Sequence, residues 1–324
     1  MRAAPDGLEV SAVVAALRDG WALDAADVEY APVGGGSYHW HAVDRGGRRV
    51  FVTVDDLDQK TWLGDTQEAS FGALRDAFDT AAELAGHGLS FVVAPLRTRD
   101  GAPLVRLDDR YSLALFPFVE GEPGTWGGYE TDADRLAVVE LVAAVHRVPV
   151  GARAVGLEIS GREHLDAALR DLEVPWAGGP LAEPTREAMQ VAAPALVDLL
   201  ALADRLRAEA EAQSVRSVVT HGEPHSGNIV RTSSGPVLVD WDTVALAPPE
   251  RDLWMLTGDG MEERYGSGVN AAALEYFRLS WDLKDLAEYL NVLRGPHTDN
   301  VDTRAWVGFV ERFPAVRPEW ADRL

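Results

Sequence analysis

The chain has 324 residues, of which 47% are hydrophobic and 25% charged, a composition typical of a globular protein and unlike that of a disordered one. It contains no cysteine, which excludes disulfides, thiolate metal sites and a cysteine nucleophile. The net charge of −22 argues against a nucleic-acid partner; it suits a cationic partner, although a solvated acidic surface has the same composition. No apolar run is long enough to cross a membrane and the first residues lack a secretory pattern, so we expect a cytoplasmic protein without a membrane partner.

The first third of the chain is predicted to be rich in β-strands. Apolar residues at helical spacing indicate two helices, at residues 8–18 and 66–85. Apolar runs bounded by turn residues indicate five strands, at 28–33, 37–43, 49–54, 91–94 and 111–118. The first three of these strands are separated by glycine-rich turns.

The remainder of the chain is predicted to be mainly helical. Helices are expected at 132–147, 162–172, 183–212, 249–256, 271–293 and 303–313, with a short β-rich section at 215–244. Pro194 is a point at which the longest helix could be interrupted. We therefore predict an α+β fold of two lobes, a β-rich N-terminal lobe at 1–118 and a mainly helical C-terminal lobe at 119–324.

The clearest chemical pattern lies in the run His221–Asn228, which reads HGEPHSGN and is flanked by apolar pairs. Glu223 and Asn228 are five positions apart in a loop held between two short strands, so their side chains are expected to face one cleft. Asp240, at the end of the following strand, would bring a further oxygen ligand to the same place. Phosphoryl transfer requires such a set: one group that orients the attacking hydroxyl, and oxygen ligands for a magnesium ion that bridges the phosphates.

This pattern resembles the catalytic-loop motif of the aminoglycoside phosphotransferase and choline kinase-like family. That motif is written His-Gly-Asp, four residues, Asn, and then a turn that contains Asp. The resemblance extends over about residues 28–293 and implies a protein-kinase-like fold that uses ATP or GTP with Mg²⁺. It implies that Glu223 is the catalytic base, that His221 braces the catalytic loop, and that Asn228 and Asp240 are magnesium ligands. Asp242 would be a supporting acid. This chain departs from the family in having Glu223 where the family has Asp, which moves the carboxylate by about a bond length.

The same residues are compatible with two alternative structures. A His-Gly-Glu-Pro run can form a simple corner between a strand and a loop, and Asn after Gly is common in turns. His221, His225 and Asp240 are residue types that bind zinc, as in a metal-dependent hydrolase, but that interpretation leaves Asn228 without a role. The spacing of three residues between apolar strands favours the phosphotransferase.

Two further segments are candidates for nucleotide binding. Gly34, Gly35, Gly36 and Ser37 lie between two predicted strands, where the resembling family has a phosphate-covering loop; a glycine-rich hairpin turn would have the same sequence. The run that contains Phe118 resembles the hinge between the lobes, whose backbone would contact adenine. A buried strand that ends in a turn is compatible with that role.

The third predicted strand lacks a residue that the resemblance implies. In the family this strand carries a lysine that contacts the nucleotide phosphates and pairs with a glutamate on the next helix, whereas this chain has Thr53 there. Lys60 is the only lysine in the predicted N-terminal lobe and is the first candidate to replace it; a solvent-exposed loop lysine is the alternative. Arg49 and Arg75 are further candidate cations. The partner acid is open between two residues of the helix, Glu68 and Glu83.

The acceptor is predicted from charge. Acidic residues outnumber basic residues in the predicted C-terminal lobe, which would attract a cationic hydroxyl compound such as an aminoglycoside or another amino-sugar antibiotic. Trp126 is one of several tryptophans that could form an apolar wall for it, although core packing is the commoner role of this residue type. We therefore predict transfer of the γ-phosphoryl group of ATP or GTP to a hydroxyl of a small polar molecule, with antibiotic resistance as one setting.

A pseudokinase that binds a nucleotide or small ligand without efficient catalysis is the alternative function. Thr53 and Glu223 favour it, because each departs from the family pattern. Asn228 and Asp240 favour an enzyme, because a scaffold without chemistry has little need of two metal ligands.

Overall fold

The computed structural model describes residues 1–213, 216–266 and 268–313; residues 214, 215, 267 and 314–324, all within the predicted C-terminal lobe, lie outside this description. The chain divides into two compact units. The first consists of Met1, Ala3–Gly156 and Val215–Asn270, and the second of Arg2, Leu157–Ser214 and Ala271–Leu324. Among the described helices, none combines the length and the apolar character that crossing a bilayer would require.

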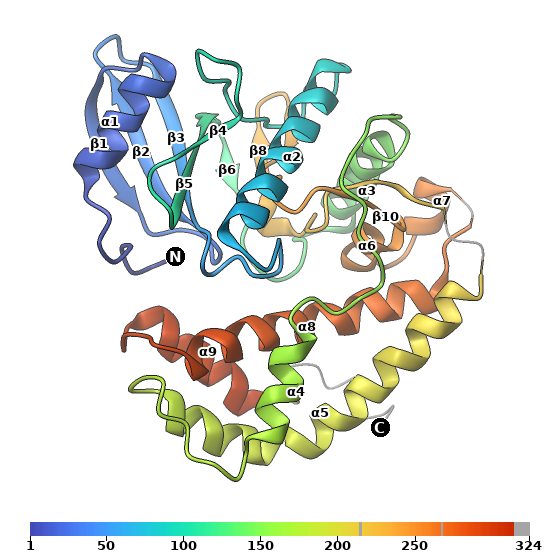
Figure 1. Cartoon of the computed structure of the whole chain (residues 1–324). Coiled ribbons are helices and arrows are strands. Elements are labelled where there is room, and N and C mark those ends of the chain that lie inside the picture. Colours follow the sequence, from blue (N-terminus) through green and yellow to red (C-terminus); the bar gives the residue numbers. More distant parts are fainter. Residues whose placement is uncertain (214–215, 267, 314–324) are drawn as a thin grey trace. The chain divides into compact units, whose positions relative to one another are not determined.

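A five-stranded antiparallel sheet forms the N-terminal part of the first unit (Figure 1). Its strands are β1 (Ala25–Ala31), β2 (Tyr38–Asp44), β3 (Arg49–Asp56), β4 (Leu104–Arg106) and β5 (Tyr111–Pro117), in the order β1-β2-β3-β5-β4. Helix α1 (Val10–Trp21) precedes the sheet, and helix α2 (Gln67–Gly86) follows β3. Thr66 caps the start of α2 by accepting a hydrogen bond from the backbone N–H of Ala69.

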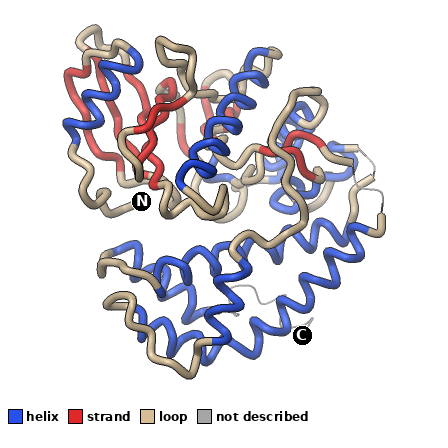
Figure 2. Tube along the Cα trace, viewed as in Figure 1, coloured by secondary structure: helices blue, strands red, loops and turns tan. Residues whose placement is uncertain are grey.

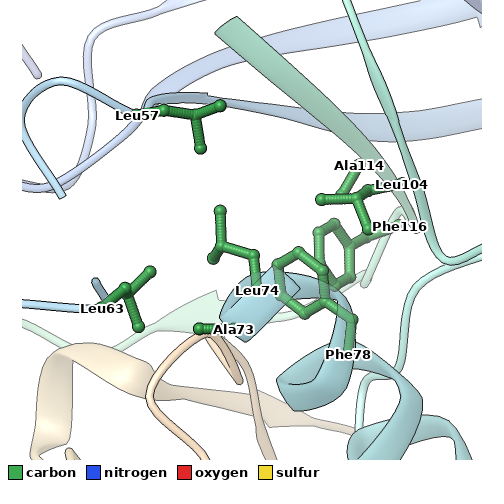
Figure 3. Packing of buried hydrophobic residues seen from close by; sticks show 8 residues of the cluster. All are labelled: Leu57, Leu63, Ala73, Leu74, Phe78, Leu104, Ala114 and Phe116. Carbon is green, nitrogen blue, oxygen red and sulfur yellow. The ribbon is translucent and has the colours of Figure 1, made fainter. Parts of the chain in front are cut away.

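A buried apolar cluster attaches α2 to the sheet (Figure 3). It contains Leu57, Leu63, Ala73, Leu74, Phe78, Leu104, Ala114 and Phe116. Leu57 and Leu63 come from the segment between β3 and α2, and each is 5% exposed or less. Because both leucines are part of this core, the segment between them, which contains Lys60, is held at its two ends.

The rest of the first unit supplies two small sheets and short helices. Strands β6 (Glu122–Pro123), β8 (Ile229–Thr232) and β9 (Gly235–Leu238) form one sheet, and β7 (Val218–Thr220) and β10 (Ala245–Ala247) form the other. The helical elements are α3 (Asp132–Val145), α6 (Glu250–Leu253), the 3-10 helix η2 (Trp254–Leu256) and α7 (Met261–Tyr265).

All regular secondary structure described in the second unit is helical (Figure 2). Its helices are α4 (Arg162–Arg170), α5 (Ala182–Glu211), α8 (Ala271–Arg294) and α9 (Val301–Arg312). Pro194 lies inside α5 without ending it. Buried residues of α5 occur on both sides of the proline, at Ala192 and Leu196, so packing of this face outweighs the lost main-chain hydrogen bond.

Most predicted elements are present, with ends that differ by a few residues. The strand predicted at 91–94 is wrong: only an isolated bridge between Val92 and Leu238 forms there. Strand β4 was not predicted, and β3 continues past Val54 to Asp56. The compact units group residues 119–156 with the sheet, so a functional boundary at 118/119 stays a prediction.

Candidate active site

The run His221–Asn228, here called the catalytic-loop candidate, is held between two short strands of the first unit. It follows β7 and ends in the 3-10 turn Ser226–Asn228, which leads directly into β8. β7 pairs with β10 and β8 pairs with β9, so main-chain hydrogen bonds fix both ends of the loop. Gly222 has a φ of +100°, and a Cβ at this position would lie 2.5 Å from the guanidinium of Arg251. Only glycine meets both conditions without strain.

Asp252, on α6, fixes the start of this loop. Its carboxylate accepts hydrogen bonds from the backbone N–H groups of His221 (2.9 Å) and Gly222 (2.6 Å), and it lies 2.9 Å from Nε2 of His146. Burial is the largest influence on the pKa of Asp252 and would raise it, but the hydrogen bond with His146 and the nearby positive charges, including that of Arg251, together lower the pKa. Sequence reasoning did not single out Asp252 as part of the site, because its distance of 30 positions from Gly222 leaves no local pattern.

His221 is fully buried and makes hydrogen bonds through both ring nitrogens. Nδ1 accepts from the backbone N–H of Glu223 at 3.2 Å, so Nε2 carries the proton that is donated to the carbonyl of Val239 at 2.9 Å. Burial lowers the pKa of the imidazole, which keeps it neutral. Since neither nitrogen is left for a metal, this geometry supports the bracing role and gives no support to a zinc site at His221.

Glu223, Asn228 and Asp240 belong to one connected stretch of backbone. The side-chain nitrogen of Asn228 donates to the carbonyl of Glu223 at 3.0 Å, which fixes the amide so that Oδ1 is the atom available to a cation. The N–H of Val239 donates to the carbonyl of Asn228 at 3.0 Å, and Asp240 is the next residue. The structure therefore brings together the three residues that the sequence motif predicted.

Asp240 has an unusual backbone conformation, with a φ of +66°. In the described part of the chain, Ala22 is the only other non-glycine residue with positive φ. Such a conformation costs on the order of 1 kcal/mol and is typical of functional sites, where the surroundings enforce it. Although the side chain of Asp240 reaches solvent, the surrounding protein displaces much of its water and, together with the charge of Asp242, raises its pKa to about 7.

Lys60 lies among these acids. Its Nζ atom lies 2.6 Å from Oδ2 of Asp242 and 3.0 Å from Oδ1 of Asp55, and the lysine side chain is only 3% exposed. Burial alone would lower the pKa of Lys60, but Asp242 and Asp55 raise it, so the ammonium stays charged. A solvent-exposed loop lysine, the alternative for this residue, does not match its burial.

The other two candidate cations are engaged elsewhere. Arg49 forms an ion pair with Glu120 at 2.5 Å, and its guanidinium lies 3.5 Å from the centre of the Phe118 ring. Arg75 is exposed beside Asp76. Arg49 thus binds two residues of the segment that was predicted to be the adenine hinge. Contact of Phe118 with the nucleotide stays a prediction.

The two acids predicted as partners of the lysine also lie elsewhere. Glu68 pairs with Arg106 at 2.8 Å, and the exposed Glu83 lies 4.0 Å from His87. Asp55, which sequence reasoning missed, pairs with Lys60 instead. The signal that could have found it is strand alternation: Asp55 is two positions after Thr53 and therefore lies on the same face of β3.

The glycine-rich segment Gly34, Gly35, Gly36 and Ser37 joins β1 and β2. Its three glycines are exposed, and Gly34 has a φ of +71°. Ser37 is buried, and its hydroxyl donates to Oδ1 of Asp55 at 2.7 Å. The Ser37 hydroxyl is therefore bound within the protein, which leaves the backbone of the segment as its means of contacting a phosphate.

Thr53 faces a histidine rather than a cation. Nδ1 of His39 lies 3.2 Å from the hydroxyl of Thr53, its partner in the β2–β3 register. Burial, with contributions from the positive charges of the N-terminal amino group and Lys60, lowers the pKa of His39 to about 3, so the ring is neutral. The position at which the family has its lysine thus holds two neutral polar groups.

Arg251 lies beside the candidate base. Its guanidinium donates to the hydroxyl of Thr220 at 2.8 Å and to the carbonyl of Thr243 at 2.9 Å. Burial lowers the pKa of Arg251, while the negative charges of Asp252 and Glu223 act to raise it. A positive charge is thus held close to the half-buried Glu223.

Most of the chain matches a known protein family. A family model described as "Phosphotransferase enzyme family" matches residues 32–289, most of the chain. The chain belongs to this phosphotransferase family. It is accordingly a small-molecule kinase of the ATP-binding type, which confirms the predicted family and enzyme class.

Several proteins resemble this phosphotransferase over three quarters or more of its length. Protein StrN of Streptomyces griseus is 28% identical over 258 residues, which are 76% of this chain and 79% of StrN. The crystal structure of spectinomycin phosphotransferase APH(9)-Ia in complex with ADP and spectinomycin matches with a TM-score of 0.69 at 16% identity over 95% of each chain. Amicoumacin kinase hAmiN, in complex with AMP-PNP and Ca²⁺, matches with a TM-score of 0.57 at 11% identity over 98% of each chain. These structures confirm the predicted α+β kinase-like fold, with an antiparallel sheet followed by a largely helical region.

The residues of this phosphotransferase suit a magnesium nucleotide. Asn228 and Asp240 offer the oxygen donors that Mg²⁺ prefers, and Asp55, Asp240 and Asp242 crowd negative charge around one lysine, a repulsion that a divalent cation relieves. Among the described residues, no three His, Asp or Glu side chains are grouped so as to hold a metal. A site of one or two protein oxygens completed by phosphate oxygens matches Mg²⁺ better than zinc.

Proposed function

We propose that this phosphotransferase transfers the γ-phosphoryl group of ATP, or of GTP, to a hydroxyl of a small polar antibiotic. The observation that carries the proposal is the position of Lys60. A lysine that follows β3 by four residues is buried within 3.0 Å of two acids, one of which lies two positions from Asp240. The positive charge that Thr53 cannot supply is thereby present beside the candidate metal ligands.

Each candidate residue would have a separate task. Glu223 would orient the acceptor hydroxyl and take its proton as the acceptor oxygen bonds to phosphorus and the bond to the ADP oxygen breaks. Lys60 would contact the phosphates, and the backbone of Gly34, Gly35 and Gly36 would cover them. Asn228 and Asp240 would hold the magnesium ion, which neutralises phosphate charge when it is bound.

The bracing contacts would preserve this arrangement between turnovers. Asp252 holds the backbone N–H groups at the start of the loop, and His221 links the loop to Val239 beside Asp240. A 1 Å misplacement of a reacting group can cost about a hundredfold in rate, so this rigidity has catalytic value. The charge of Arg251 beside Glu223 would help to hold the longer carboxylate in place.

The antibiotic acceptor is supported by similarity and by charge. Spectinomycin phosphotransferase and amicoumacin kinase share the fold, and a net charge of −22 suits a cationic acceptor. Trp126, which is 67% exposed, packs edge-on against His225 with ring centres 4.5 Å apart. We propose Trp126 as an apolar wall next to the catalytic loop.

The test is ADP release from ATP and Mg²⁺ with a panel of acceptors: spectinomycin, amicoumacin, aminoglycosides, other hydroxylated amines and nucleosides. Release that depends on one acceptor and is lost in Asp240→Ala supports the proposal and names the substrate class. If no acceptor promotes release while calorimetry detects nucleotide binding, the pseudokinase alternative is favoured. Unchanged turnover in Asp240→Ala would contradict the assignment of the site.

A further inference from the structure

Asp55 is a buried carboxylate to which the proposed reaction assigns no direct task. Its side chain is 1% exposed, and its Oδ1 atom lies 2.7 Å from the hydroxyl of Ser37 and 3.0 Å from Nζ of Lys60. Within the described residues, its Oδ2 atom has no hydrogen-bond partner, and neither has the hydroxyl of Ser112, its cross-strand neighbour on β5. A buried carboxylate that is only partly hydrogen-bonded costs free energy, so fold stability alone does not explain it.

The neighbouring carboxylate has a different environment. Asp56 is also 1% exposed, but Arg110 binds it through two nitrogens, Nε and Nη2. Since successive side chains of a strand point to opposite faces, Asp55 and Asp56 serve different sides of the sheet. Asp56 is paired with an arginine on one side of the sheet, whereas Asp55 is paired with Lys60 on the other. Asp56 is therefore a suitable control for substitutions of Asp55.

The backbone of Lys60 is fixed, but its side chain needs an anchor. Leu57 and Leu63 hold the segment in the core (Figure 3), and the hydroxyl of Ser70 on α2 donates to the Lys60 carbonyl at 3.1 Å. From this position the ammonium has two anionic neighbours, Asp55 and Asp242. Asp242 is two residues from the candidate metal ligand Asp240, where a bound metal ion would compete with Lys60 for its carboxylate, whereas Asp55 is on the strand itself.

We propose that Asp55 is the positioning residue that holds Lys60 toward the nucleotide phosphates, in place of an acid on α2, and that Ser37 couples this pair to the glycine-rich segment. The inference rests on the proposed phosphotransferase function. The Ser37 hydroxyl and the Lys60 ammonium both bind Oδ1 of Asp55. A movement of the glycine-rich segment would therefore move this carboxylate and, with it, the lysine side chain. Lysine and acid come from one strand and the segment that follows it, so no side chain of α2 takes part in the ion pair itself.

The experiment is a double-mutant cycle with Asp55→Asn and Lys60→Met. The dissociation constant of Mg-ADP is measured by calorimetry, kcat/KM for ATP is measured with the acceptor found above, and the melting temperature is recorded for each protein. Asp55→Asn alone is expected to weaken both nucleotide parameters by about tenfold to a hundredfold, the usual effect of losing a group that orients a ligand-binding side chain. In the Lys60→Met background the same substitution is expected to have no further effect on either parameter, because Asp55 acts through Lys60.

Asp56→Asn is the matched control. It removes an equally buried carboxylate from the same strand, so it is expected to lower the melting temperature but to leave the Mg-ADP dissociation constant unchanged. Ser37→Ala is the milder variant, expected to weaken binding in the same direction by a smaller factor; if Asp55→Asn does not fold, Ser37→Ala takes its place in the cycle.

Three outcomes would overturn the inference. The first is an equal loss from Asp55→Asn with and without Lys60, which would mean that the two residues act independently. The second is a loss of nucleotide affinity in Asp56→Asn as large as that in Asp55→Asn. The third is a wild-type protein that binds no nucleotide, in which case the proposed function fails as well; the first two outcomes leave that function intact.

Discussion

Two segments supply charged groups to this site, and they are organised in different ways. The catalytic-loop candidate and the hairpin after it, His221–Asp242, form a local unit in which short strands and hydrogen bonds fix each residue relative to its sequence neighbours. The segment from β3 to Lys60 instead acquires its role through distant contacts: Lys60 is 182 positions from Asp242. The first segment keeps the family spacing with one residue exchanged, whereas the second lacks the family residue, for which we propose Lys60, outside the strand, as the replacement.

This difference indicates which features of a site tolerate rearrangement. A base and metal ligands must be aligned with a reacting bond, and a hairpin with fixed register maintains that alignment. A lysine acts on phosphates as a flexible point charge on a long stem, so it can reach them from more than one backbone position.

Asp240→Asn is expected to have the largest effect. Asparagine tolerates the left-handed conformation that Asp240 adopts, so the backbone is preserved while the negative charge is lost. We expect kcat to fall by about a thousandfold, because stabilisation of transition-state charge by a metal is worth several kcal/mol. Steady-state kinetics with varied Mg²⁺ measures the change.

The backbone strain at Asp240 supplies an internal control for that variant. Asp240→Gly should be as inactive as Asp240→Asn but more stable than Asp240→Ala by about 1 kcal/mol, because glycine adopts positive φ without cost. Thermal or urea unfolding measures the difference in stability between Asp240→Gly and Asp240→Ala. Equal stabilities would mean that the backbone at residue 240 is not strained, and activity retained in Asp240→Asn would remove this residue from the metal site.

Lys60→Met tests the relocated charge and is expected to lower kcat/KM for ATP by about a hundredfold, the usual effect of losing one electrostatic contact to the reacting group. It should also destabilise the protein, because Asp55 and Asp242 remain buried without their cation. Lys284→Met, at the only other lysine of the chain, is the matched control and should leave nucleotide affinity unchanged.

Returning the lysine to the strand tests whether positions 53 and 60 can serve the same phosphates. Thr53→Lys in the Lys60→Met background should restore part of the lost nucleotide affinity, and only part, because Thr53 is buried against His39. Calorimetry with Mg-ADP measures the recovery. A complete absence of recovery would mean that the two positions do not reach the same phosphates, and that the site has diverged further than a single relocation.

The same contrast explains what the sequence could predict. The helices and most strands follow from hydrophobic periodicity, and the loop residues His221, Glu223, Asn228 and Asp240 are brought together as expected because their spacing and the flanking strands determine local geometry. The strand expected at 91–94 was wrong because a short apolar run has no periodicity that distinguishes a strand from a buried loop.

The partners formed by tertiary contacts outside the local motif could not be predicted in this way. Lys60 was suggested by elimination, since few lysines exist, but its partner was sought on α2, where Glu68 in fact binds Arg106. Asp55 was overlooked because β3 was expected to end at Val54, and a buried carboxylate at the end of a strand resembles a turn residue in sequence. Asp252 was likewise not singled out as part of the site, yet it binds the backbone of the catalytic loop.

Glu223→Asp tests whether the exchanged residue of the local segment is adapted to its surroundings. The aspartate restores the family motif but withdraws the carboxylate by about a bond length from the place at which Arg251 holds positive charge. We expect kcat to fall by about tenfold to a hundredfold with little change in the KM for ATP. A rise in kcat would show instead that Glu223 is a burden to catalysis, as the pseudokinase alternative requires.

Trp126→Ala is expected to have the smallest effect, because Trp126 lies outside both charged segments and its ring packs edge-on against His225 of the catalytic loop. Loss of an exposed aromatic wall should raise the KM for the acceptor by about threefold to tenfold, which corresponds to the 0.5–1.5 kcal/mol typical of an aromatic contact. The KM for ATP and kcat should change little, and Trp126→Phe should recover most of the affinity since it keeps an aromatic face. If both variants lower kcat and leave the acceptor KM unchanged, Trp126 supports the loop through His225 and does not touch the acceptor, which would add a packing contact to the hydrogen bonds that already hold the local segment in place.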